Sequence, residues 1–137
     1  MSDLDRAGRS PLHYAALDGD ADRVTQLIAA GWDVNQSDVD GFTPLHFAAQ
    51  SHALEATNVL LDHGAHLDAV NRFGNSPLLV AMTASAGRRA EIILLRDRGA
   101  DPNLKNRTGV SAVDLARIVT NFDFSDLFPE APGRTSN

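Results

Sequence analysis

The sequence has no cysteine and only one lysine, Lys105. Without thiols the chain cannot form disulfides, thiolate zinc sites, iron–sulfur clusters or a cysteine nucleophile. No stretch approaches the roughly 18 apolar residues of a membrane span, and the polar opening MSDLDRAGRS lacks the apolar run of a signal peptide. We therefore expect a soluble, cytoplasmic protein that has no membrane partner.

Basic residues are scarce in the first half of the chain. The formal net charge is −6, which argues against a nucleic-acid partner because phosphate binding depends on clustered Lys and Arg. Residues 1–70 hold three basic and eleven acidic side chains, whereas residues 71–137 hold nine basic and seven acidic ones. Two interpretations of the acidic half remain open: a solvated surface, or a docking field for a basic protein partner.

The dominant pattern in the sequence is an internal repeat. The segments DRAGRSPLHYAALDGD, DVDGFTPLHFAAQSHA and NRFGNSPLLVAMTASAG align with one another, with the glycines Gly8, Gly41 and Gly74 spaced 33 residues apart. A second set, Gly31, Gly64 and Gly99, follows at spacings of 33 and then 35, which predicts a two-residue insertion within residues 83–87. The segment ADPNLKNRTGVSAVDLAR then begins a fourth, partial unit.

Each unit carries the signals of two helices. A Ser or Thr followed by Pro, as in Thr43-Pro44, suits the start of a first helix because the hydroxyl caps it and the first helical position needs no N–H. An apolar run such as residues 59–61 predicts the buried stripe of a second helix. The glycine that follows each run suits a left-handed helix end, and Asp5, Asp38 and Asn71 carry turn chemistry into the next unit.

Period and motif together resemble the ankyrin repeat family, whose signature is T-P-L-H-x-A. TPLHFAA matches that signature fully, SPLHYAA nearly so, and SPLLVAM and SAVDLAR are degenerate. The resemblance implies an all-α solenoid of stacked helix–turn–helix units joined by β-turn loops. We expect a domain over residues 1–128 and a disordered tail over 129–137; the repeats are expected at 5–37, 38–70 and 71–105, with a C-terminal capping repeat at 106–128.

The resemblance also gives a role to the histidines of the motif. It implies that His13 and His46, at the junctions between repeats, form structural hydrogen bonds to backbone and to the neighbouring Ser or Thr, and Leu79 at the same place in the third unit removes that polar link. The end of the stack is expected to be covered by apolar side chains: Leu115, Ile118, Phe122, Phe124, Leu127 and Phe128. Because the chain begins with Met1 and ends with such a cap, we expect a complete protein.

Catalytic and metal-binding patterns are weak. His63 and His66 lie three residues apart, but Gly64 ends the helix between them and no third ligand is evident. The sequence has no phosphate-binding glycine loop and no serine elbow. We expect no enzyme activity, no cofactor and no metal, and an enzyme or metal-dependent protein is only a remote alternative.

The resemblance implies that partner contacts come from the turn tips and the exposed ends of the first helices. The residues at these places are Arg6, Arg9, Leu17, Asp18, Val39, Asp40, Phe42, Gln50, Ser51, Arg72, Phe73, Asn75 and Thr83. Phe42 and Phe73 either anchor a partner or fold back on a neighbouring turn. Trp32, after the repeat glycine, either packs inward or faces a partner.

The expected function is that of a non-catalytic protein–protein interaction module, monomeric when free and serving as an adaptor or a dedicated inhibitor. The alternative is a bacterial immunity protein that neutralises a basic toxin. Eleven arginines against one lysine suit a protein encoded by a GC-rich bacterial genome.

Overall fold

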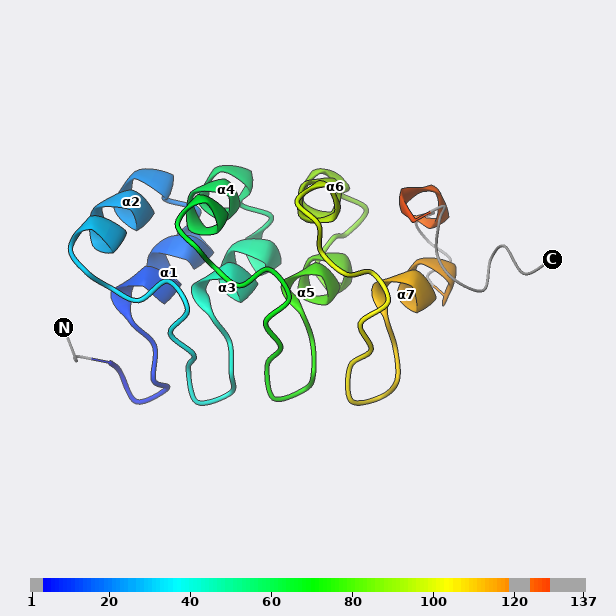
Figure 1. The fold of residues 1–137 in the computed structure, drawn as a ribbon, viewed down its shortest axis with the longest axis horizontal. Coiled ribbons are helices and arrows are strands. Elements are labelled where there is room, and N and C mark those ends of the chain that lie inside the picture. Colours follow the sequence, from blue (N-terminus) through cyan, green and yellow to red (C-terminus); the bar gives the residue numbers. More distant parts are fainter. Residues whose placement is uncertain (1–3, 119–123, 129–137) are drawn as a thin grey trace.

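The computed structural model describes residues 4–118 and 124–128, which form a row of stacked helix pairs with hairpin loops on one side (Figure 1). The inner helices are α1 (Pro11–Asp18), α3 (Pro44–Ser51), α5 (Pro77–Thr83) and α7 (Ala112–Ile118). The outer helices are α2 (Ala21–Ala29), α4 (Leu54–Asp62) and α6 (Ala90–Asp97), and the short 3-10 helix η1 (Ser125–Leu127) continues the outer row. The described residues contain no strand, so the all-α prediction is confirmed.

The predicted helix starts are confirmed at the inner helices. In α3, Thr43 Oγ1 accepts a hydrogen bond from the backbone N–H of His46 at 3.4 Å, and Pro44 occupies the first turn. In α5, Ser76 Oγ accepts from the backbone N–H of Leu79 at 3.3 Å. The hydroxyls thus pair N–H groups that a helix start leaves without a partner.

Neighbouring hairpins are tied together through their backbones. Each hairpin ends in a two-residue turn, and these four turns, at residues 6–7, 39–40, 72–73 and 107–108, are called the tip row below. The N–H of Val39 donates to Ala7 O at 2.8 Å, that of Arg72 to Asp40 O at 2.8 Å, and that of Arg107 to Phe73 O at 3.0 Å. The tips therefore hold one another in a fixed register.

Two histidines link successive units in the way that the resemblance implies. His46 Nδ1 accepts from the backbone N–H of Thr43 at 3.1 Å, and its Nε2 lies 2.9 Å from the carbonyl oxygen of Asn75. Accepting at Nδ1 places the proton on Nε2, so the neutral ring donates to the carbonyl of the next unit. His13 repeats this arrangement toward Phe42 O, and burial lowers the pKa of both histidines.

The third unit departs from the other two. Leu79 is buried where the other units have histidine, so this unit has no imidazole link to the next one. The insertion lies where the sequence predicts it, because residues 84–89 join α5 to α6, whereas two residues join α1 to α2 and α3 to α4. Within this longer connection Ala86 adopts a left-handed conformation with φ of 49°.

The core consists of two apolar clusters that follow the stack. One is built around Leu12, Val24, Leu45 and Leu60 in the first two units, and the other continues from α5 to the end of the described chain. Phe124, Leu127 and Phe128 are buried in the second cluster, as a terminal cap requires, whereas Ile118 is 61% exposed. Phe122 and the predicted tail at 129–137 lie outside the described residues. Trp32 packs against the first cluster and is half-buried.

One acidic side chain is buried in the stack. Glu91 in α6 is 0% exposed, and its Oε2 accepts a hydrogen bond from the Thr57 hydroxyl of α4. Its second carboxyl oxygen, Oε1, has no hydrogen-bond partner among the described residues. Burial raises the pKa of Glu91 to about 7, because an ionised carboxylate is poorly solvated there.

The close approach of the tips predicts that glycine is needed at Gly41 for more than its backbone angle. A Cβ on Gly41, whose φ is 81°, would lie 2.9 Å from Asn71 Cα, whereas a Cβ on Gly64, with φ of 94°, would meet nothing within 4 Å. Gly64→Ala should lower the free energy of unfolding by about 1–2 kcal/mol through backbone strain alone. Gly41→Ala should lower it by about 2 kcal/mol more. Urea unfolding measures both, and equal losses would show that tip contact imposes no constraint.

Glu91 predicts a fall in stability as pH rises. Its folded pKa of about 7 exceeds the ordinary glutamate value of 4.5, so the folded state holds this proton more tightly, and its stabilisation is lost as pH rises from 4.5 to 7. The stability of the wild type relative to Glu91→Gln should fall by up to about 3 kcal/mol across this range. The histidines with lowered pKa make the stability of both proteins rise with pH, and this contribution cancels when the unfolding free energies of wild type and Glu91→Gln are subtracted. A difference that stays flat with pH in urea unfolding would contradict this prediction.

Candidate binding surface

The predicted partner-binding residues lie on the inner helices and the hairpins, but their exposure differs. Val39 is 69% exposed and Phe73 is 50% exposed at the second and third tips. The other exposed members of the set are Arg6, Asp18, Gln50, Arg72 and Thr83, and the half-buried members are Arg9, Leu17, Asp40, Phe42, Ser51 and Asn75.

The two phenylalanines behave differently. Phe42 stacks on Phe47 with ring centroids 5.5 Å apart and an interplanar angle of 13°, and it meets the His46 ring edge-on at 5.6 Å. Phe42 therefore folds back, which is one of the two alternatives that the sequence leaves open. Phe73 instead remains half exposed, with the Arg72 guanidinium carbon 5.4 Å from its ring centroid.

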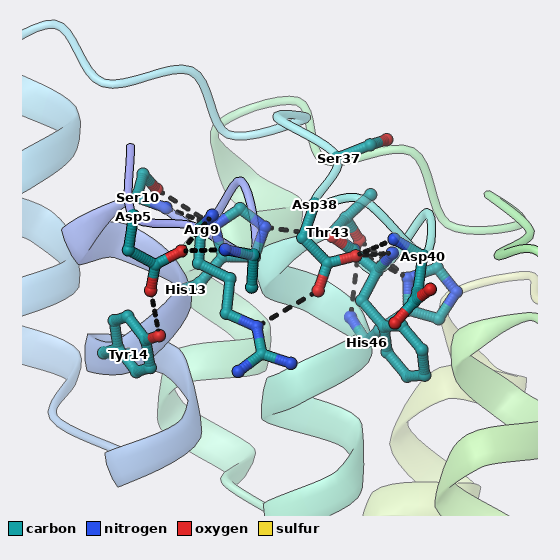
Figure 2. A network of polar contacts seen from close by, with 12 residues as sticks. Asp5, Arg9, Ser10, His13, Tyr14, Ser37, Asp38, Asp40, Thr43 and His46 are labelled. Carbon is teal, nitrogen blue, oxygen red and sulfur yellow. Dashed lines mark hydrogen bonds and ion pairs between the residues drawn. The ribbon is translucent and has the colours of Figure 1, made fainter. Parts of the chain in front are cut away.

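Arg9 is fixed between the first two units (Figure 2). Its Nε donates to Asp38 Oδ2 at 3.1 Å, and its guanidinium carbon lies 5.0 Å from the Phe47 ring centroid and 6.0 Å from that of Tyr14. Sequence reasoning missed Tyr14, which is 40% exposed beside this arginine. The sequence signal was its position: Tyr14 follows the motif histidine as Phe47 does in the second unit, so both aromatic rings lie on inner helices close to Arg9.

The carboxylates around the tips are engaged inside the protein. Asp38 Oδ1 accepts from the backbone N–H groups of Asp40 at 2.9 Å and Phe42 at 2.8 Å, and its side chain is fully buried. Asp40 pairs with Arg72 at 2.9 Å. These acidic groups stabilise the turns and their neighbours.

Two further acidic groups follow the same rule. Asp5 accepts from the Tyr14 hydroxyl and from the backbone N–H groups of Ala7 and Arg9, and the Tyr14 bond is the largest cause that lowers its pKa. Asp114 pairs with Lys105 at 2.9 Å, which together with Ser111 lowers the pKa of that carboxyl to about 2. Each carboxylate near the tips thus already has a donor.

Several predicted contact residues also have structural hydrogen bonds. Ser51 Oγ donates to Leu17 O of the preceding unit, and Thr83 Oγ1 donates to Val80 O at 3.0 Å. Asn75 provides the carbonyl that His46 reaches, and its Oδ1 accepts from Asn106 Nδ2 at 2.9 Å. The contacts of Ser51 and Asn75 join neighbouring units, whereas that of Thr83 stays within α5.

The acidic excess of the first half lies mainly away from the tip row. Asp22 belongs to α2, Glu55 and Asp62 belong to α4, and Asp33 and Asp68 lie in the loops that follow these outer helices. The tip row itself carries arginines at three of its four turns: Arg6, Arg72 and Arg107. Sequence reasoning missed Arg107, although it repeats the register of Arg72 with a spacing of 35.

The part of the chain that the structure describes shows no catalytic constellation. Within residues 4–118 and 124–128, no three His, Asp or Glu side chains gather to hold a metal ion. A hollow of about 420 Å³ beside the end of α5 is lined by residues such as Met82, Ala84 and Phe124, and no titratable side chain lines it. No helix in the described part of the chain is long and apolar enough to cross a membrane.

These features define an ankyrin repeat protein. The family described as Ankyrin repeats (3 copies) matches residues 12–106, and the chain belongs to this family. Ankyrin repeats are modules for protein–protein interaction and are generally non-catalytic.

Known proteins with similar sequences are much longer than this chain. It is 37% identical over 103 residues to human Rabankyrin-5, a match that covers 74% of this chain and 9% of the relative. It is 36% identical over 93 residues to palmitoyltransferase Hip14 of Drosophila melanogaster, covering 68% of this chain and 14% of that protein. It is 36% identical over 117 residues to putative palmitoyltransferase ZDHHC13 of Danio rerio, a match that covers 84% of this chain and 18% of that protein. The chain thus spans less than a fifth of each relative.

The buried Asp38 carboxylate predicts unequal effects for two neighbouring aspartates. Asp38→Ala leaves two backbone N–H groups and the Arg9 Nε without their acceptor, so it should lower the free energy of unfolding by about 2–4 kcal/mol. Asp40→Ala removes an exposed pair with Arg72 and should lower it by less than about 1 kcal/mol. Thermal or urea unfolding of the two variants makes the comparison. Similar losses would mean that Asp38 does not organise the turn.

Proposed function

We propose that this protein is a non-catalytic module that binds a partner protein through its tip row and the face formed by its inner helices. The observation that carries the proposal is the exposure of Val39 and Phe73 on neighbouring tips, at 69% and 50%. Apolar side chains this exposed bury little surface within the protein itself. Aromatic and arginine side chains side by side, as Phe73 and Arg72 are, commonly anchor interfaces.

The rigidity of the stack supports the same proposal. Backbone hydrogen bonds join each tip to the next, so the exposed side chains are held in place before a partner arrives. A pre-ordered surface binds with a smaller loss of conformational entropy. On this proposal the free protein is a monomer, and the same surface serves either an adaptor or a dedicated inhibitor.

The two phenylalanines predict opposite effects on stability and binding. Phe42→Ala removes a ring that stacks in the first core cluster, so it should lower the free energy of unfolding by about 2–4 kcal/mol. Phe73→Ala should lower it by less than about 1 kcal/mol, because the ring is half exposed. Phe73→Ala should instead weaken partner binding by about tenfold or more, mainly through faster dissociation.

Capture of partners from a lysate of the native host on immobilised protein, with mass spectrometry, provides the binding measurement. Leu54→Ala is the matched control, since Leu54 is 39% exposed on an outer helix. One stoichiometric partner indicates a dedicated inhibitor, and several unrelated partners indicate an adaptor. Recovery that falls with Leu54→Ala and not with Phe73→Ala would move the interface to the outer helices.

A further inference from the structure

The arginines of the tip row occupy one repeated position. Arg6, Arg72 and Arg107 are each the first residue of their turn, and the second tip has the exposed Val39 at this place. The row seen along one edge in Figure 1 therefore presents, in order, a cation, an apolar side chain and two cations. Phe73 adds a second apolar side chain beside Arg72.

The nitrogen donors of these arginines are largely unused. Arg6 and Arg107 form no side-chain hydrogen bond, ion pair or ring contact with the residues that the structure describes. Arg72 donates one terminal nitrogen to Asp40 Oδ1, and its side chain remains 64% exposed. The carboxylates near the tips, in contrast, already accept hydrogen bonds from the protein. The arginine donors of the tip row therefore have few acceptors within the protein, and a partner with carboxylates supplies them.

The regular stacking fixes the spacing that a ligand must match. Packed helices lie about 8–10 Å apart, so successive tips repeat at about this interval. A peptide in the extended polyproline II conformation advances about 3.1 Å per residue and returns to the same face at every third residue, which makes about three residues per tip. A segment that crosses all four tips would thus need an acidic, an apolar, an acidic and an acidic residue at every third position.

The charge distribution favours a peptide over a nucleic acid at this row. Acidic side chains such as Asp22, Glu55 and Asp62 on the outer helices, and the net charge of −6, oppose a long polyanion. A short acidic segment meets only the local arginines, because charges beyond about 10 Å are screened at 0.1 M salt. Val39 and Phe73 offer apolar contact, for which a phosphate backbone has no counterpart.

We propose that the tip row binds an extended acidic segment of the partner protein, with carboxylates at Arg6, Arg72 and Arg107 and an apolar side chain against Val39 and Phe73. This inference rests on the proposed function, since it names the chemistry of the partner at the same surface. It departs from the expectation of a basic partner, because the acidic side chains that would attract one lie mainly on the outer helices.

A labelled decapeptide tests the inference directly. The probe is fluorescein-Glu-Thr-Ser-Val-Thr-Ser-Glu-Thr-Ser-Glu, and its anisotropy is followed with the full chain at 50 mM and at 300 mM NaCl. Two matched peptides carry Gln or Lys in place of every Glu. We expect binding of the Glu peptide that weakens at high salt, and at least about tenfold weaker binding of both matched peptides.

Charge-matched variants locate the contact on the protein. Arg72→Gln and Arg107→Gln should each weaken binding of the Glu peptide by about five- to tenfold. Arg23→Gln removes the same charge from an exposed position on α2, and it should leave binding unchanged. Circular dichroism confirms that the variants are folded, which is expected because Arg107 forms its contact with Phe73 through the backbone.

Three results would overturn the inference: tighter binding of the Lys peptide, equal binding of the Gln peptide, or equal weakening by Arg23→Gln. Failure of the inference and failure of the proposed function are distinguishable. If the acidic peptide does not bind while Phe73→Ala still reduces capture of the native partner, the acidic chemistry is wrong and the binding surface stands. If neither measurement depends on the tips, both fail.

Discussion

A backbone N–H of each turn tip donates to a carbonyl of the tip before it, and this contact leaves no room for a side chain at Gly41 or Gly74. The spacing of the units, the alignment of the inner helices and the reach of His13 and His46 to the next carbonyl all depend on that close approach. The proposed binding surface depends on it as well. Side chains that stand on separate turns act as one row because the turns cannot slide past one another.

The features that the sequence predicts well are those set within a few residues of chain. Thr43 and Pro44 start a helix by local capping, Asp38 closes its own turn, and the repeat glycines take left-handed angles. These local motifs recur at a regular spacing of 33 residues, so the architecture follows from the sequence alone, and the one longer spacing locates the insertion. The place of the binding surface on the hairpins and inner helices came from the resemblance to the ankyrin repeat family, and it stays a prediction.

Apart from the histidines of the motif, the side-chain contacts between units could not be predicted, because they join residues that lie far apart in the sequence, such as Arg9 with Asp38 and Thr57 with Glu91. Whether Phe42 faces solvent depends on Phe47 in its own unit and on how the units stack. The choice of Asp38 as the partner of Arg9, and the burial of Glu91 against Thr57, likewise depend on side-chain directions that composition does not encode. Charge counted along the chain could not distinguish the outer helices from the tips.

The replacement of histidine by Leu79 gives the stack a chemical polarity along its length. The imidazoles of His13 and His46 accept a backbone N–H at Nδ1, so a proton added there removes this acceptor at the helix start, while Nε2–H still donates to the carbonyl of the next unit. The junction that follows the third unit has leucine in this place and no such proton acceptor. Acid therefore weakens the helix starts of the first two units and spares that of the third.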